Sequence, residues 1–188
     1  SQIALKEAQA DFSAFIQRLR AYRVLDPACG SGNFLYLALK TLKDLEHRAN
    51  LEAEALGLHR ELVIETSPAN VLGIELNPYA AELARVTVWI GEIQWMLAHG
   101  YPVRRDPILR PLDHVENRDA VLLAHYEGVA IEDAEKERDS MLVAAFEPEW
   151  PDADAIVGNP PFLGDKKMRA ELGDEYTRAL RKQYEGRV

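Results

Sequence analysis

Cysteine is almost absent from this chain, since only Cys29 occurs among its 188 residues. A single cysteine cannot form a disulfide within the chain, so a disulfide-stabilised fold is excluded. The five histidines are scattered without the spacing of metal ligands, and no metal site is predicted. The hydrophobic content of 47% is that of a soluble globular protein, and at this length we expect one domain with a sizeable core.

Long apolar runs are also lacking. No stretch approaches the roughly 20 apolar residues that cross a bilayer, and the N-terminus has no signal-peptide pattern. We therefore expect a cytoplasmic protein without a membrane partner. The chain has fewer basic than acidic residues. It contains 22 Lys and Arg and 31 Asp and Glu, which gives a net charge of −9. This excludes a wholly basic nucleic-acid binder, although it leaves local basic patches open.

Helical and extended patterns alternate along the chain. Apolar residues at helical spacing predict helices over residues 3–20 and 35–55 and after Pro78. Short buried strands are predicted in YRVLD, in NVLGIEL, over residues 113–116 and in DADAIVGNPP. The segment IEDAEKERDSMLVAAF fits either a helix or a charged excursion, and YPVRRDPILRP is predicted to be a loop. This alternation predicts an α/β fold with a mostly parallel sheet, helices on both faces and ligands bound beyond the carboxyl ends of the strands.

Polar clusters follow each predicted strand. In LDPACGSGNF, Gly30 and Gly32 allow a tight turn, and the Asp26 carboxylate suits a cationic group better than a pyrophosphate. The spacing is neither GxGxxG nor that of a phosphate-binding loop, and the turn alone could be purely structural. Glu75 could bridge two ribose hydroxyls or cap the helix that follows it. Asp119 could accept a hydrogen bond from an adenine amino group or could be a turn residue.

The stretch DAIVGNPPFLGDKKM forms a stiff corner behind an apolar run. Pro160 biases Asn159 toward extended geometry, and neither Pro160 nor Pro161 has a backbone donor. The corner is therefore rigid and rich in carbonyl acceptors, so a group with hydrogens to donate fits it.

Three motifs in this order, VLDPACGSGNFL, GIELNP and DAIVGNPPF, resemble those of S-adenosylmethionine-dependent amino-methyltransferases, specifically the DNA adenine-N6 methyltransferases. Protein-glutamine methyltransferases carry a similar NPPY, but the DPACGSGNF form favours the DNA enzymes. The stretch GNPPFLGDKKMR is similar to fused restriction-modification enzymes of the MmeI kind and related phage-defence methyltransferases. The resemblance covers the chain from about Phe12 onward and implies a Rossmann-like class I methyltransferase fold.

The resemblance implies methyl transfer from S-adenosylmethionine to the N6 amino group of adenine in double-stranded DNA, within a restriction-modification or phage-defence system. The side-chain oxygen of Asn159 and the carbonyl of Pro160 would each accept one amino hydrogen, and Phe162 would stack on the flipped base. The implied catalytic residues are Asn159, Pro160, Pro161 and Phe162. The implied cofactor-binding residues are Asp26, Pro27, Ala28, Gly30, Gly32, Asn33, Phe34, Glu75, Leu76, Asp119 and Ala120.

Two alternative functions stay open. The chain could methylate protein glutamine or RNA, or it could be a non-catalytic cofactor-binding module. Lys166, Lys167 and Arg169 could likewise contact phosphates or form a solvated helix start. The target sequence, a fused nuclease and the oligomeric state cannot be read from the residues.

We interpret residues 1–188 as the N-terminal part of a catalytic domain, with its first four strands. The family's later strands, its antiparallel hairpin, its target-recognition domain and its usual FxGxF-like element are not recognised in the sequence. We expect the 188-residue chain to self-associate through uncovered apolar surface and to leave duplex DNA unmethylated. Sequence-specific methylation by the purified chain would contradict this prediction.

Overall fold

A computed structural model describes residues 2–61, 63–102, 112–127, 141–162 and 164–187. The chain divides into two compact units. Unit 1 comprises Ser1–Arg118 and Pro151–Pro160, and unit 2 comprises Asp119–Trp150 and Pro161–Val188. Within the described ranges, no helix is long and apolar enough to span a membrane.

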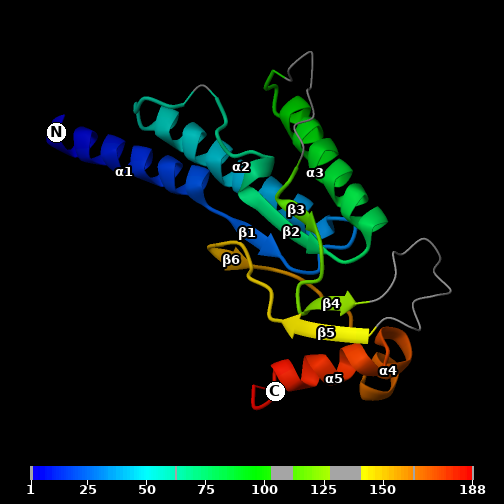
Figure 1. Cartoon of the computed structure of the whole chain (residues 1–188). Coiled ribbons are helices and arrows are strands. Elements are labelled where there is room, and N and C mark those ends of the chain that lie inside the picture. Colours follow the sequence, from blue (N-terminus) through cyan, green and yellow to red (C-terminus); the bar gives the residue numbers. More distant parts are fainter. Residues whose placement is uncertain (1, 62, 103–111, 128–140, 163, 188) are drawn as a thin grey trace. The chain divides into compact units, whose positions relative to one another are not determined.

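Unit 1 is built on a four-stranded parallel sheet (Figure 1). Its strands are β1 (Val24–Asp26), β2 (Val71–Glu75), β3 (Val115–Asn117) and β6 (Ala155–Ile156), in the spatial order β3-β2-β1-β6. Val24 pairs with Val71 on one side and with Ala155 on the other. The four strands expected from the sequence are confirmed, and all their carboxyl ends lie at the same edge of the sheet.

Three long helices flank this sheet: α1 (Gln2–Ala21), α2 (Asn33–Ala55) and α3 (Pro78–Ala98). A short 3-10 turn, η1 (Pro68–Asn70), precedes β2. Asn77 caps α3 by accepting hydrogen bonds from the backbone N–H groups of Tyr79 and Ala80, and Pro78 occupies the first helical position. The fold is therefore α/β, as the alternating pattern predicts, and the three helices have nearly the expected bounds.

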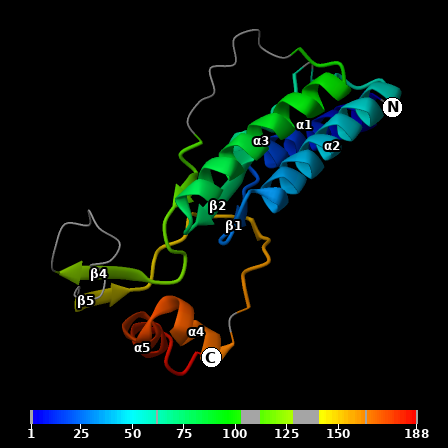
Figure 2. The same ribbon diagram turned by 90° about the vertical axis from the view of Figure 1, so that its right-hand side faces the viewer.

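Helices α2 and α3 lie side by side (Figure 2) because small residues allow a close approach. A Cβ added at Gly32 would lie 2.9 Å from the Cα of Ala84, and one added at Gly91 would lie 2.3 Å from the Tyr36 ring. The core beneath them consists of buried apolar side chains from both helices and from the strands. Its members are Cys29, Leu35, Leu39, Val71, Ala84, Val88, Leu112 and Val115.

A buried polar cluster joins α2 and α3 to the segment before β2. The Glu46 carboxylate accepts hydrogen bonds from both the backbone N–H (2.8 Å) and the hydroxyl (2.6 Å) of Thr66. The Lys43 ammonium donates to the Thr66 carbonyl at 2.7 Å and forms an ion pair with Glu92 at 2.9 Å. Each buried charge thus has a partner, which removes most of the cost of excluding it from water.

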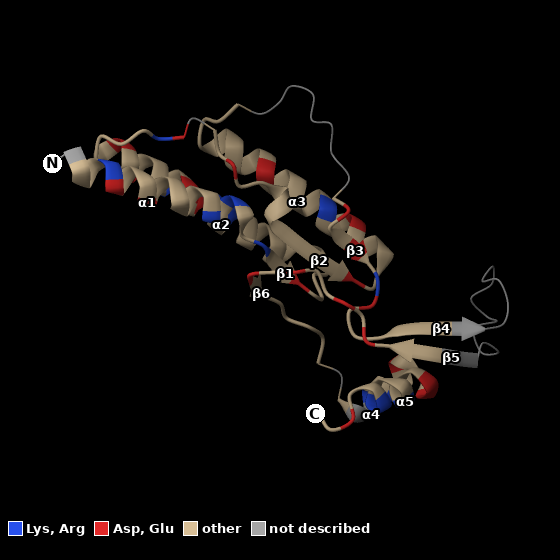
Figure 3. Cartoon of the chain, turned by 60° about the vertical axis from the view of Figure 1, so that its left-hand side comes forward, with Lys and Arg blue, Asp and Glu red and all other residues tan. Residues whose placement is uncertain are grey.

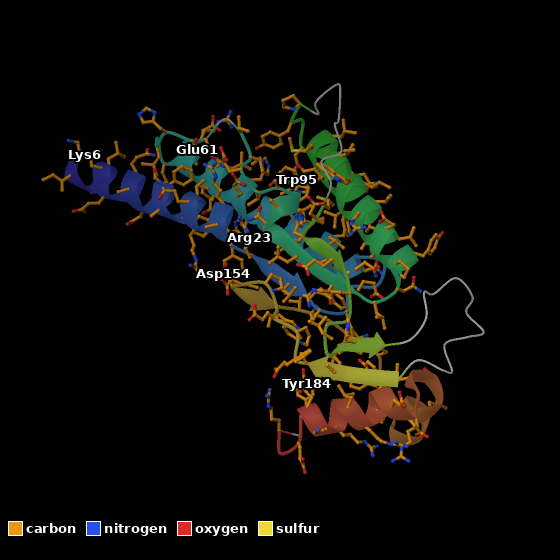
Figure 4. The ribbon with its side chains drawn as sticks, in the orientation of Figure 1. Lys6, Arg23, Glu61, Trp95, Asp154 and Tyr184 are labelled. Atoms are coloured by element: carbon orange, nitrogen blue, oxygen red, sulfur yellow. The ribbon has the colours of Figure 1, made fainter. Side chains whose placement is uncertain are left out.

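The C-terminal end of α1 is fastened by Asn70, at the end of η1. Its side-chain amide donates to the carbonyls of Leu19, Arg20 and Tyr22, which an isolated helix would leave unsatisfied. Close by along the chain, the Arg23 backbone N–H donates to the Asp154 carboxylate at 2.8 Å (Figure 4). The starts of β1 and β6 are therefore tied together by a side chain as well as by the sheet.

Charges of both signs are interspersed along the three long helices (Figure 3). Ion pairs at i, i+4 spacing join Lys40 to Asp44 and Arg48 to Glu52 on α2. No helix of unit 1 therefore presents a surface of one sign, although the chain as a whole is acidic.

Unit 2 consists of a β-hairpin and two short helices. Strand β4 (Leu123–Glu127) pairs antiparallel with β5 (Met141–Phe146), and α4 (Asp165–Leu172) leads through Gly173 into α5 (Asp174–Gln183). The sequence pattern leaves the segment ending at Phe146 open between a helix and a charged excursion, and both options are wrong for Met141–Phe146. Residues 128–140, and residues 103–111 of the predicted proline-rich loop, lie outside the described residues.

The stability of the protein should depend on pH through His114. Burial lowers the pKa of this ring from 6.5, with the Pro68 backbone and Asp113 acting in the opposite direction. Between 6.5 and the lower folded-state pKa, the unfolded chain binds more protons than the folded chain, so stability falls on acidification. We expect the free energy of unfolding, measured with urea, to fall from pH 7.5 to 5.5, and to fall less in His114→Asn. Equal slopes in the parent protein and in His114→Asn would contradict the assignment.

Candidate active site

The carboxylate of Asp26 lies at the carboxyl end of β1 and is fully buried. Its Oδ1 accepts a hydrogen bond from the backbone N–H of Ala28 at 3.1 Å. Its Oδ2 is buried and has no hydrogen-bond partner among the described residues. A buried carboxylate oxygen without a partner is costly, and it is the feature expected where a cationic or hydrogen-bonding ligand completes the site.

Glu75, at the end of β2, fastens the glycine turn that follows β1. Its Oε2 accepts the backbone N–H of Gly30 at 2.8 Å, and its Oε1 accepts that of Asn77 at 2.8 Å. The cap of α3 is Asn77, so the interpretation of Glu75 as the helix cap is wrong. Each carboxylate oxygen has used one lone pair in these contacts and keeps a second, so two further donors such as ribose hydroxyls can still be accepted.

The last residue of β3 holds the backbone where β2 ends. The Asn117 side chain donates to the carbonyls of Glu75 and Leu76, at 2.8 and 2.9 Å. The backbone N–H of Arg118 adds a third bond to the Glu75 carbonyl, at 3.1 Å. The backbone at Leu76, directly after the last residue of β2, is thereby held in place, and the Leu76 side chain is exposed.

The glycine turn contains two glycines with different physical roles. Gly30 has a φ of 52°, and a Cβ added to it would meet nothing within 4 Å, so this stretch of backbone borders open space. Gly32 has a φ of 86° and packs against α3 at Ala84, so it is required by helix packing as well as by its left-handed conformation. Both glycines stay predicted cofactor-binding residues, and for Gly32 the structure adds a packing reason.

Cys29 is buried in the core beneath this turn. Burial, and then the negative charges of Asp26 and Glu75, raise the pKa of its thiol to about 12. The thiol is therefore protonated at neutral pH, and the thiolate needed for nucleophilic chemistry is not formed. Asn33 and Phe34 begin α2 directly after the turn, with the Phe34 side chain partly exposed.

The stiff corner begins where β6 ends, next to Asp26. The backbone N–H of Val157 donates to the Leu25 carbonyl at 2.9 Å and so continues the sheet by one bond past β6. Gly158 follows, and a Cβ added to it would lie 2.8 Å from the Oδ1 of Asp26. Asn159 and Pro160 come next and are exposed, so the acceptor groups of the corner are accessible.

Two carboxylates therefore lie at the ends of adjacent strands, and the hydrogen bonds found for them among the described residues come from backbone N–H groups. Burial raises the pKa of Asp26 above 3.8, the Ala28 hydrogen bond opposes the shift, and the charge of Glu75 adds to it. Bringing a positively charged group next to Asp26 would lower this pKa again and favour the ionised form. The electrostatics thus favour a ligand that carries a cation on one part and hydroxyl donors on another.

Four predicted site residues belong to unit 2: Asp119, Ala120, Pro161 and Phe162. The Oδ1 of Asp119 accepts the backbone N–H groups of Val121 and Leu122, and its Oδ2 accepts the Tyr176 hydroxyl at 2.6 Å. These are the contacts of a turn residue, and they leave one lone pair on Oδ2. The Ala120 carbonyl accepts the Trp150 indole N–H at 2.7 Å. Pro161 is exposed, and the Phe162 side chain is 92% exposed.

The sequence motifs assign no functional role to three residues of the site region: Asn77, Asn117 and Gly158. Asn77 and Asn117 follow strand-like segments, where a side-chain amide is a general signal for capping or bracing. Gly158 directly precedes the NPP motif, and a glycine inside a strand pattern is a general signal for close backbone approach.

The chain is similar in sequence to DNA methyltransferases. The family model described as "MmeI, DNA-methyltransferase domain" matches residues 3–187. DNA methyltransferase A of Bacillus subtilis (strain 168) is 27% identical over 164 residues, which are 83% of this chain and 16% of that protein. A putative type II restriction enzyme and methyltransferase of Methanocaldococcus jannaschii is 33% identical over 85 residues, or 43% of this chain and 7% of that protein.

A solved structure of the type IIL restriction-modification enzyme MmeI in complex with DNA also matches. It is 28% identical, with a TM-score of 0.43, over 53% of this chain and 14% of that one. The chain thus spans less than a fifth of the length of each of these proteins.

The bonds of Glu75 predict a measurable contribution to stability. Glu75→Ala leaves two backbone N–H groups without their charged acceptor and should lower the free energy of unfolding by about 1–3 kcal/mol. Glu75→Gln keeps one oxygen and should cost less. Urea unfolding of the three proteins checks this order, and an Ala variant as stable as the parent would show that the turn does not depend on Glu75.

Proposed function

This chain belongs to the family of MmeI-type DNA-methyltransferase domains, and on that premise we propose that the full-length protein containing it methylates the N6 amino group of adenine in double-stranded DNA, with S-adenosylmethionine as the methyl donor. The full-length protein would act within a restriction-modification or phage-defence system. One observation carries it. The glycine turn, Glu75 and the Asn159 corner follow adjacent parallel strands and meet at one edge of the sheet.

The hydrogen-bond acceptors of unit 1 fit S-adenosylmethionine. This cofactor supplies an electrophilic methyl group on a sulfonium when it is bound. The unpaired Oδ2 of Asp26 would accept from the ammonium group of the methionine part. The second lone pairs of Glu75 would accept the two ribose hydroxyls, and Leu76 would contact the adenine ring. The open space at Gly30 leaves room for a ligand along the turn, whose backbone also includes Pro27 and Ala28.

Asp119 and Ala120 are proposed to contact the adenine ring of the cofactor. The remaining lone pair on the Asp119 Oδ2 would accept one hydrogen of the adenine amino group. The three hydrogen bonds that this carboxylate accepts within unit 2 would fix its orientation before the cofactor binds.

The corner would activate the target amine. The side-chain oxygen of Asn159 and the carbonyl of Pro160 would each accept one amino hydrogen, which draws the nitrogen toward tetrahedral geometry and directs its lone pair outward. These bonds strengthen as positive charge develops on the nitrogen, so they stabilise the transition state more than the ground state. Pro161 keeps the corner stiff, and Phe162 would stack on the flipped base.

Mass spectrometry of nucleosides tests the proposal most directly. DNA incubated with the full-length protein and S-adenosylmethionine should gain N6-methyladenine. RNA and a peptide containing glutamine are assayed in parallel, because the alternative functions predict methylation of one of these instead. No methylated product from any substrate, together with intact binding of S-adenosylhomocysteine, would favour a cofactor-binding module.

Calorimetry tests the cofactor separately from the reaction. S-adenosylhomocysteine should bind, and NAD should not, because no glycine fingerprint for a pyrophosphate follows β1. Tighter binding of NAD would overturn the assignment of the site.

Turnover should depend on the side chain of Asn159. Asn159→Ala removes one of the two acceptors on the amine, and loss of a single transition-state hydrogen bond lowers turnover by about 10²–10³. Asn159→Asp keeps an oxygen acceptor and should lose less activity. The control Gln94→Ala removes an exposed amide on α3 and should leave turnover unchanged. Single-turnover assays with saturating cofactor give these rates, and a parental rate for Asn159→Ala would remove the residue from the mechanism.

A further inference from the structure

Gly158 immediately precedes the corner, and its lack of a side chain is required by space. Its φ lies outside the left-handed region, so its backbone conformation is open to any residue. The space where a side chain would begin is already occupied: an added Cβ would lie 2.8 Å from the Asp26 Oδ1 and 3.6 Å from both the Asp26 carboxyl carbon and the Pro27 Cδ. The residue in front of the corner is therefore in contact with the carboxylate of the glycine turn.

Neither side of this contact can move away freely. The Asp26 carboxylate is fully buried and is held by the Ala28 backbone N–H. On the other side, the Val157 backbone is bonded to Leu25, so the sheet holds the chain up to the residue before Gly158. A methyl group at position 158 must therefore displace the carboxylate, the corner or both.

We propose that Gly158 is a positioning residue that links the binding of the methyl donor to the placement of the target amine. The proposal rests on the function proposed above, in which Asp26 holds the donor and Asn159 holds the acceptor. With glycine at 158, the Asp26 carboxylate lies directly against the backbone that carries Asn159. The position of the Asp26 carboxylate then determines the position of Asn159. A shift of either residue therefore displaces the other.

A purely structural role for Gly158 predicts something different. If the glycine only allowed the strand to pack, Gly158→Ala would lower stability, Asp26→Ala would relieve that loss, and the methyl-transfer rate of the folded protein would not change. The linkage predicts instead that the rate falls and that this effect depends on the carboxylate. A double-mutant cycle separates the two possibilities.

The experiment compares Gly158→Ala, Asp26→Ala and the double variant in the full-length protein. The binding constant for S-adenosylhomocysteine is measured by calorimetry, and the methyl-transfer rate by single turnover at saturating cofactor. Gly158→Ala should weaken binding roughly tenfold and lower the rate about 10²-fold, because a displacement near 1 Å is enough for such a loss. In the Asp26→Ala background the same change should lower the rate less than about threefold. Additive effects, or a parental rate for Gly158→Ala, would overturn the linkage.

Gly164→Ala is the matched control, because a Cβ at that position meets nothing within 4 Å; it should change neither the binding constant nor the rate by more than about twofold. If Gly158→Ala does not fold, as judged by circular dichroism, Asp26→Asn and Asp26→Ala are compared. Asn fills the same space, so its rate at saturating cofactor should exceed that of Ala about tenfold, and equal rates would overturn the linkage. Failure of the proposed function is distinct, because the parental protein itself would then methylate no adenine.

Discussion

Strand β1 is hydrogen-bonded to a parallel neighbour on both sides, and the candidate site depends on this constraint. The strand is three residues long and wholly buried, and its parallel pairing fixes one register against β2 and one against β6. That pairing places Asp26 opposite Gly73, brings Glu75 to the turn after β1, and brings Gly158 against the Asp26 carboxylate. The functional groups are thus positioned by main-chain pairing before any ligand is present.

The site keeps two carboxylates close together. Such an arrangement opposes folding, since burial and mutual repulsion both disfavour the charged form of Asp26. Glu75 offsets part of the cost by accepting two backbone N–H groups, whereas Asp26 retains an oxygen with no partner among the described residues. A buried carboxylate oxygen without a partner lowers stability, and such costs are common at functional positions.

The elements that depend on local pattern could be predicted from the sequence, and those that depend on contacts between distant residues could not. The spacing of apolar residues predicts α1 and α2 to within two residues and the start of α3. Short apolar runs between these helices predict the parallel strands. The hairpin β4–β5 was not predictable, because its second strand directly follows a highly charged segment. At the site, the motifs single out Asp26, Glu75 and Asn159. The glycine at 158 signals a close backbone approach, but its partner Asp26 lies far away in the chain and could not be predicted.

The three bonds from Asn70 to the last carbonyls of α1 have a consequence for the order of folding. They join residues 48 to 51 positions apart, so the loop they close contains β1 and α2. Closing a loop of that length is entropically costly unless the segment between its ends has already become compact. We infer that β1 and α2, which lie inside this loop, become compact before the end of α1 is fastened to Asn70, so that α1 docks late in folding.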